Sequence, residues 1–177
     1  MRLIRRLLIL LVILGAVFVG VGLILPGSVR VERSAVIQAQ PAAIFPLLND
    51  FRKFNQWSPW AARDPEATYA YTGPDQGVGA RMTWQSQQHG AGSQEIVTSV
   101  PSDTVATALD LGAMGTAKAG YTLKAEGGAT RVTWNLETNL PYNPAARWMG
   151  LMFDRWIGAD YEAGLARLKS LAEKGSV

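Results

Sequence analysis

Few side chains in this 177-residue chain are of the types that enzymes use for covalent or metal chemistry. The chain has no cysteine and a single histidine, His89, which lies between Gln88 and Gly90 in a stretch typical of a turn. These counts exclude a Cys–His pair, a His-based metal cage and an H-E-x-x-H zinc motif. A serine nucleophile would lack both a base and a G-x-S-x-G elbow. We therefore predict no metal and no cofactor, and we expect His89 to be solvated.

Carboxylates beside apolar segments are the remaining candidates for acid–base chemistry. Asp110 ends a predicted strand between two leucines, Asp154 and Arg155 interrupt an aromatic helical segment, and Glu162 follows on the same helix. A cyclase-type enzyme could use one of these groups as a general acid or base if the group faced an apolar pocket. The competing interpretation, which we favour for Asp154 and Arg155, is a solvated edge where charges pair locally.

Bulky apolar side chains could serve a ligand instead of a reaction. Six tryptophans are many for a chain of this size, and they accompany five methionines. Such side chains fit an ordinary packed core, and they also fit the wall of an apolar cavity that holds a hydrophobic molecule. The sequence leaves both interpretations open. The predicted lining of the cavity is Trp57, Trp60, Met82, Trp84, Leu109, Tyr121, Trp134, Met152 and Trp156.

The elements that would position these side chains are mostly short strands. An opening strand is predicted over residues 29–37, and further strands follow over 80–87, 93–100, 104–111, 117–125 and 130–137, separated by turn residues. In 117–125, apolar residues alternate with Lys118, Thr122 and Lys124, so one face of this strand is apolar and the other polar. The spacing favours an antiparallel meander with one apolar face.

Helical patterns flank these strands. A helix is predicted over residues 41–48, a second short helix over 49–57 that ends before Pro59, and a long helix over 144–174. The first half of the long helix is apolar nearly all round, whereas its second half has one apolar stripe that should lie on the sheet. The stripe consists of Ile157, Tyr161, Leu165 and Leu168. This order of elements predicts an α+β fold.

A membrane anchor precedes this domain. The segment Leu7–Leu25 contains 19 uninterrupted apolar or glycine residues, which is about the length that crosses a bilayer. Arg2, Arg5 and Arg6 lie before it and by themselves account for the net charge of +3, so the rest of the chain is neutral. The neutral remainder argues against a nucleic-acid partner. The membrane itself is the predicted partner, and the sequence leaves the oligomeric state open.

The arginines also predict the orientation of the anchor. The positive-inside rule keeps them in the cytoplasm. We therefore predict a cytoplasmic tip and transmembrane anchor over residues 1–27, with residues 28–177 on the periplasmic or extracellular side of the inner (cytoplasmic) membrane. A cleaved signal peptide is the alternative, but the apolar run is longer than a usual signal and no A-x-A site follows it.

Four segments carry a resemblance to a known superfamily. They are residues 31–39 together with 41–45, 51–60, 128–134 and 157–169. In this order the chain resembles bacterial, membrane-anchored members of the SRPBCC superfamily, which joins START lipid-transfer domains, polyketide cyclases/dehydrases and the birch-pollen allergen fold. The resemblance implies a helix-grip fold, in which a curved antiparallel sheet wraps around a long C-terminal helix and leaves an apolar tunnel between them.

The functional expectation combines the anchor with this resemblance. We expect a membrane-tethered domain outside the cytoplasm that binds a small hydrophobic or amphipathic, lipid-like molecule between the sheet and the last helix. One alternative is an enzyme similar to polyketide cyclases/dehydrases that uses Asp110, Asp154 or Arg155. Another is a ligand-free module with a filled core that contacts another envelope protein. Fold alone does not choose among them.

Overall fold

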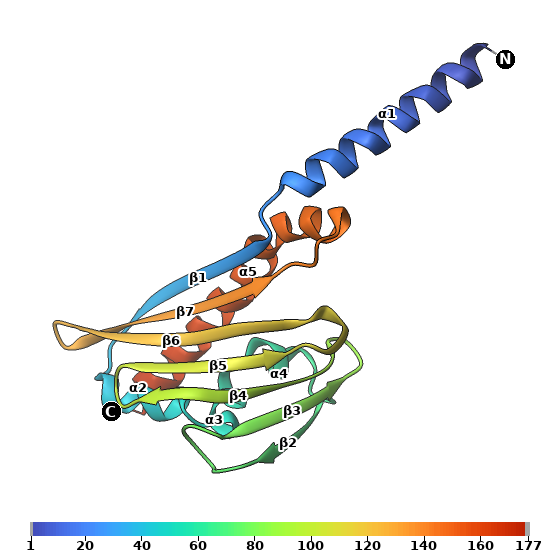
Figure 1. The fold of residues 1–177 in the computed structure, drawn as a ribbon. Coiled ribbons are helices and arrows are strands. Elements are labelled where there is room, and N and C mark those ends of the chain that lie inside the picture. Colours follow the sequence, from blue (N-terminus) through green and yellow to red (C-terminus); the bar gives the residue numbers. More distant parts are fainter. Residues whose placement is uncertain (1, 176–177) are drawn as a thin grey trace.

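The middle of the chain forms one antiparallel sheet in the computed structural model, which describes residues 2–175. The seven strands lie in the order β1-β7-β6-β5-β4-β3-β2, so β2 to β7 form a meander and β1 closes it by pairing with β7. The sheet is curved, and the helices that follow the first strand lie on one side of it (Figure 1). The strands are β1 (Ser28–Ile37), β2 (Thr68–Thr72), β3 (Arg81–Ser86), β4 (Gly90–Val100), β5 (Thr104–Asp110), β6 (Thr116–Glu126) and β7 (Ala129–Asn139).

Local capping fixes where the main helices of the domain begin. The Asp50 side chain accepts hydrogen bonds from the first backbone N–H groups of α3, and the Ser58 and Asn143 side chains do the same for α4 and α5. A proline at the first position of α2, α4 and α5 presets the helical φ. The helices are α1 (Arg2–Ile24), α2 (Pro41–Leu48), α3 (Phe51–Trp57), α4 (Pro59–Arg63) and α5 (Pro144–Lys174), with a 3₁₀ turn η1 (Gly112–Met114).

This architecture confirms the predicted α+β helix-grip fold, and it adds two short elements that the pattern did not predict. The strand β2 has five residues and lies at the edge of the sheet, so it pairs on one side only. The helix α4 begins directly after Ser58. Pro59, which was expected to end the preceding helix, also occupies the first position of this new one. Both elements are too short for a hydrophobic period to develop.

The second half of α5 packs on the inner face of the sheet. Tyr161, Leu165 and Leu168 are almost fully buried, which confirms the predicted stripe. The Tyr161 ring stacks on the Trp134 ring of β7 with centroids 3.8 Å apart and an interplanar angle of 11°. Gly164 permits this contact, because a Cβ atom there would lie 2.7 Å from the Trp134 ring and 3.2 Å from Pro59. This aromatic contact therefore joins β7 of the sheet to α5.

The first helix projects away from this body (Figure 1). Most of its large aliphatic side chains are about half exposed or more, and among its described residues only Gly22 is buried. The helix is long and apolar enough to cross a membrane. Its exposure is consistent with a single-pass anchor.

Replacing Gly164 with valine tests the close approach of α5 to the sheet. We expect Gly164→Val to destabilise the folded state by about 1–3 kcal/mol, because the added atoms overlap the Trp134 ring. The measurement is urea unfolding of the full chain in detergent micelles, followed by near-ultraviolet circular dichroism. The control is Ala163→Val, at an exposed neighbouring position of α5. Equal unfolding midpoints for the two variants would contradict this packing.

Candidate functional site

The predicted cavity wall is largely an aromatic cluster in contact with itself. Trp57, Tyr121 and Trp134 are buried, with ring centroids 5.3 to 5.9 Å apart in each pair. Phe54 adds edge-on contacts to Trp57 and Trp134. Such edge-to-face pairs are favourable beyond the area that they bury. Under the second half of α5, these predicted lining residues therefore pack as core.

Polar anchors hold the two tryptophans of the short helices in place. The Trp57 indole N–H donates to the Leu47 carbonyl over 3.0 Å. The Trp60 indole N–H donates to Asp160 of α5 over 3.1 Å, and Arg63 forms an ion pair with the same carboxylate. Both of these indole N–H groups therefore have a hydrogen-bond partner, as buried polar groups require. The first bond ties α3 to α2, and the contacts with Asp160 tie α4 to α5.

The inner face of the sheet is less covered at the other end. Trp84 on β3 and Leu109 on β5 point to the inner face but are only half-buried, whereas Met82, in the same part of the sheet, is 3% exposed. Met82 also receives the Asn55 amide N–H on its sulfur over 3.2 Å. The apolar floor of the sheet therefore continues beyond the aromatic cluster toward an opening.

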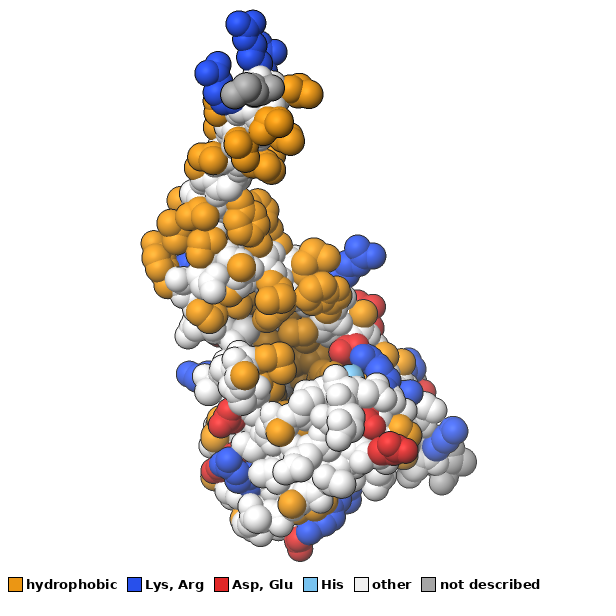
Figure 2. Space-filling view, turned by 90° about the vertical axis from the view of Figure 1, so that its right-hand side faces the viewer, with side chains coloured by type: hydrophobic (Ala, Val, Ile, Leu, Met, Phe, Trp, Pro, Cys, Tyr) orange, Lys and Arg blue, Asp and Glu red, His pale blue; other side chains and the backbone are white. Residues whose placement is uncertain are grey.

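The first half of α5 carries exposed apolar side chains. Met152 is 38% exposed and Trp156 is 51% exposed, so neither joins the aromatic cluster. Figure 2 shows hydrophobic side chains continuing from the projecting helix onto the body, where they line a recess. The structure thus separates the predicted lining into three parts: a packed floor, two half-buried residues at its edge, and two exposed residues on α5. We call the two edge residues, Trp84 and Leu109, the rim residues.

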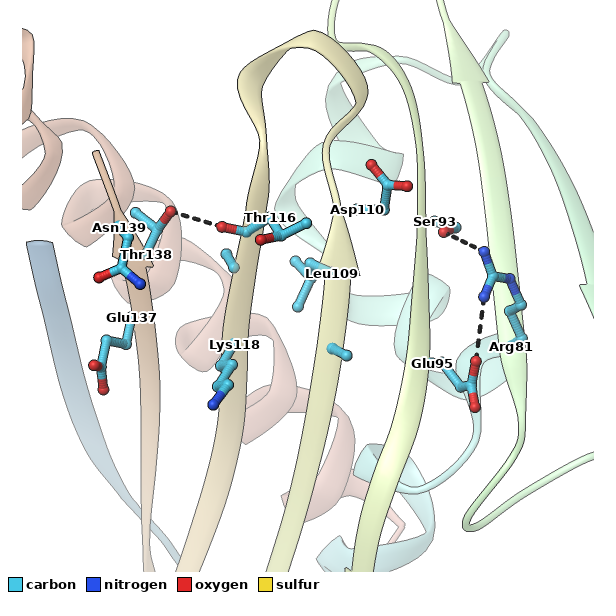
Figure 3. A pocket seen from close by; sticks show the side chains of 12 residues that line it. Arg81, Ser93, Glu95, Leu109, Asp110, Thr116, Lys118, Glu137, Thr138 and Asn139 are labelled. Atoms are coloured by element: carbon cyan, nitrogen blue, oxygen red, sulfur yellow. Dashed lines mark hydrogen bonds and ion pairs between the residues drawn. The ribbon is translucent and has the colours of Figure 1, made fainter. Parts of the chain in front are cut away.

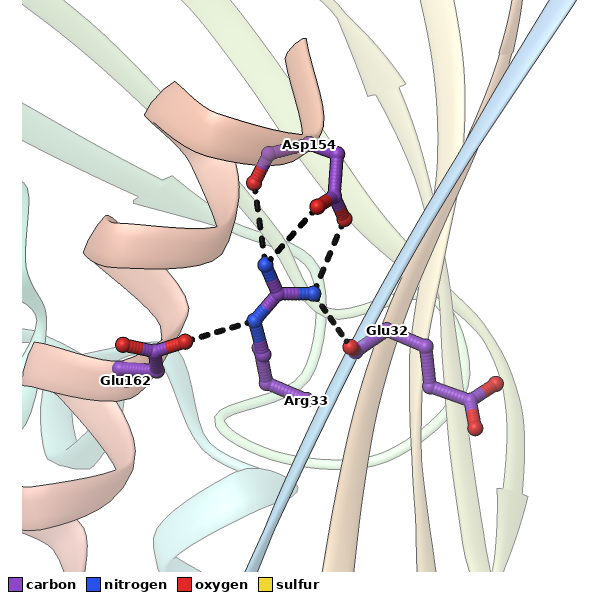
Figure 4. A network of polar contacts seen from close by, with 4 residues as sticks. All are labelled: Glu32, Arg33, Asp154 and Glu162. Atoms are coloured by element: carbon purple, nitrogen blue, oxygen red, sulfur yellow. Dashed lines mark hydrogen bonds and ion pairs between the residues drawn. The ribbon is translucent and has the colours of Figure 1, made fainter.

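An arginine on the inner face of the sheet forms ion pairs with two carboxylates of α5. Arg33 of β1 lies opposite Trp134 on the inner face and points toward α5 (Figure 4). Its Nη1 donates to Asp154 over 2.9 Å and its Nε to Glu162 over 2.7 Å. The two carboxylates are two helical turns apart, and Gly158 between them leaves room, since a Cβ there would overlap the guanidinium. Arg33 therefore clamps β1 to α5.

This clamp changes the acid–base properties of the candidate residues. Hydrogen bonding to Arg33 lowers the pKa of Asp154, and the bonds to Asp154 and Glu162 raise the pKa of Arg33. Asp154 stays ionised at neutral pH and is a poor proton donor. It pairs with β1, not with Arg155 as a local edge would suggest, and Arg155 is exposed. The positions do not support acid–base catalysis by these two residues.

Asp110 lies on the opposite side of the sheet. With Arg81, Glu95, Lys118 and other side chains from β3 to β7, it lines a hollow of about 390 Å³ on the outer face (Figure 3). Its carboxylate accepts a hydrogen bond from the Gly112 N–H over 2.9 Å, which fixes the turn after β5. Arg81 pairs with Glu95 over 3.2 Å. This mixed-charge hollow is unsuited to an apolar ligand and is remote from α5.

His89 lies in the turn before β4, as predicted, and its backbone N–H donates to Ser86 over 2.8 Å. Its Nε2 atom is buried and has no hydrogen-bond partner among the described residues, so the ring is less solvated than expected. Within residues 2–175, no group of three or more His, Asp or Glu side chains could hold a metal ion.

Sequence reasoning missed Arg33, although a signal for it exists. An arginine at an apolar-facing strand position breaks the alternation of β1, and the spacing Asp154, Gly158, Glu162 places two carboxylates around a glycine on one helix face. The arginine on β1 and the two carboxylates on α5 account for each other. This pairing can be inferred only when β1 and α5 are known to be adjacent.

Comparison with known proteins identifies a family for the domain. The family model described as "Polyketide cyclase / dehydrase and lipid transport" matches residues 28–173. A comparison with curated proteins gives no match.

Solved structures share the fold at low sequence identity. The protein CV1439 from Chromobacterium violaceum has a TM-score of 0.57 and 16% identity, covering 84% of this chain and 99% of its own. Ara h 8.0201 has 0.59 and 10%, covering 82% and 98%. The di-domain ARO/CYC StfQ from the steffimycin biosynthetic pathway has 0.63 and 11%, covering 84% and 52%. At these identities the likeness concerns the fold.

The bond between Asp154 and Arg33 predicts a pH-dependent stability. Because folding lowers the pKa of this carboxyl, its contribution is present above the ordinary pKa of 3.8 and is lost as pH falls through the folded-state value. We expect Asp154→Asn to lower the unfolding midpoint at pH 7, and we expect the difference from the parent chain to shrink as pH falls below 3.8, because protonation of Asp154 removes the charge that asparagine lacks. Thermal unfolding across this range measures the difference. The control Glu66→Gln, at an exposed position, should change little. A pH-independent difference would contradict the assignment.

Proposed function

Because this chain belongs to the polyketide cyclase / dehydrase and lipid transport family of the SRPBCC superfamily, we propose that it is a membrane-tethered domain that binds one hydrophobic or amphipathic, lipid-like molecule. The ligand would lie between the inner face of the sheet and the first half of α5. Trp57, Tyr121 and Trp134 form the floor below it, and the rim residues contact its apolar part.

One observation carries this proposal: the apolar inner face of the sheet is not fully covered by α5. Under the second half of the helix the aromatic cluster is packed, whereas Trp84 and Leu109 remain half-buried toward the opening. Exposed apolar surface of this kind in a concave position is typical of a ligand site. Binding would be driven by burial of apolar area at about 25 cal/mol per Å², before the cost of association.

The charged groups favour binding over catalysis. Asp154 and Glu162 neutralise Arg33, and Asp110 faces the outer side of the sheet. A cyclase-type reaction needs a proton donor or acceptor that faces the ligand, and none of these three carboxylates has that position. The arrangement of α1 supports the tether, and the arginines before the apolar run support a domain outside the cytoplasm.

A pair of adjacent residues on β5 tests the ligand site. Leu109 points to the inner face and Ala108 to the outer face, so Leu109→Gln and Ala108→Gln place the same amide on opposite sides of one strand. We expect the full chain, purified from its membrane in detergent, to retain a lipid at one-to-one stoichiometry in native mass spectrometry. Leu109→Gln should reduce the retained fraction by about tenfold, because it removes roughly 1.5 kcal/mol of apolar contact.

The matched variant separates a specific ligand from lipids that surround the anchor. Ala108→Gln keeps α1 unchanged and should retain the lipid as the parent chain does. Lipid extraction followed by mass spectrometry identifies the molecule. Equal retention by all three proteins, or no retained lipid in the parent chain, would contradict the proposal.

A further inference from the structure

The start of α5 carries an apolar surface that faces away from the sheet. We propose that the first half of α5, residues 144–156, lies in the outer leaflet of the bilayer that α1 crosses, with this surface among the lipid acyl chains. The inference rests on the tether in the proposed function, but it does not depend on a bound ligand. We call this surface the outward face, and it consists of Trp148, Met149, Leu151, Met152, Arg155 and Trp156.

The outward face changes character along the helix. In the first half, Met149, Leu151 and Trp156 are 52%, 54% and 51% exposed. In the second half the exposed positions carry only small or polar side chains, namely Ala159, Glu162, Ala163, Ala166, Arg167 and Ser170. A helix that met water along its whole length would not need large apolar residues on one half of its exposed side. The two halves therefore lie in different surroundings.

Contacts with the membrane helix identify the surroundings of the first half. The Trp148 ring stacks on Phe18 of α1 with centroids 5.6 Å apart, and its indole N–H donates to the Phe18 carbonyl over 3.0 Å. Gly22 is buried because Pro144 lies against it. Arg147 donates to the carbonyl of Leu25 at the end of the apolar run. The start of α5 is thus docked on the last two turns of α1.

These contacts determine how deep Trp148 lies in the bilayer. Phe18 precedes the end of the apolar run, Leu25, by about 10 Å at 1.5 Å per residue. The run as a whole matches the hydrocarbon core of roughly 30 Å. Trp148, which contacts Phe18, therefore lies inside the boundary of the core and not above it. Amphipathic helices at membrane surfaces insert their apolar faces to about 5–10 Å, which agrees with this position.

The charges of this segment are compatible with the leaflet. Asp154 is the acidic group of the first half, and Arg33 neutralises it over 2.9 Å. Arg155 has no ion pair among the described residues, so its long side chain is free to reach lipid phosphates while its methylene stem stays among apolar groups. Tyr142, 76% exposed, and the exposed Trp156 have the amphipathic rings that favour the membrane–water boundary.

Single cysteines in the full chain test this position, because the natural sequence has none. Leu151→Cys labels the outward face, Ser170→Cys labels the same helix roughly 28 Å farther along, and Val12→Cys labels the middle of α1. Each variant carries an NBD fluorophore and is reconstituted in vesicles of phosphatidylcholine and phosphatidylglycerol. Phosphatidylcholine with a doxyl quencher on its acyl chain is then added to the bilayer composition.

We expect the emission at residues 12 and 151 to fall by about half with the quencher and the emission at 170 to stay unchanged, since only the first two lie at acyl-chain depth. Quenching at 12 without quenching at 151 would overturn the inference and leave the tether intact. A blue-shifted but unquenched label at 151 would assign the surface to a protein partner and also overturn it. No quenching at 12 would remove the tether, and the inference with it.

Discussion

The contact between the Trp134 and Tyr161 rings is the interaction on which the remaining geometry depends. It joins β7, the strand next to the edge strand β1, to α5 with ring centroids 3.8 Å apart, and the rings of Trp57, Trp60 and Tyr121 lie around it. The second half of α5 is held there. The first half continues past this contact, with Gly150 buried beside Val29 and Leu140 on one side and exposed apolar side chains on the other.

The Arg33 clamp also sets the orientation of α5 relative to the sheet. A stacked ring pair fixes separation but permits a helix to pivot, whereas hydrogen bonds from one guanidinium to Asp154 and Glu162 fix two turns of α5 against β1. The planar, always charged arginine suits this role because it bonds to both carboxylates at once. The same bonds neutralise Asp154 within the apolar half of the helix. One residue thereby holds β1 on α5 and neutralises a charge in the apolar half of the helix.

Much of the fold was predictable from the sequence because it depends on local periodicity. The long apolar helix near the N-terminus, the strands of the meander and the buried stripe of α5 agree with the structure, since alternation and helical spacing report which face of an element is apolar. The sequence patterns did not predict β2 and α4, because each is five residues long and too short to show a hydrophobic period. Arg33 was missed because its partners are more than a hundred residues away in the chain.

The sequence by itself determined the faces: which side of each strand is apolar, which stripe of α5 is buried, and which end of the chain is suited to a bilayer. The folded structure was needed to show how deeply each side chain is buried and which side chains it contacts. Tyr121 and Trp134 share the apolar inner face of the sheet with Trp84 and Leu109, yet the first two pack with Trp57 of α3 as core and the last two remain half-buried. The physical reason is that periodicity specifies the direction of a side chain, whereas its packing depends on what the other elements bring against it.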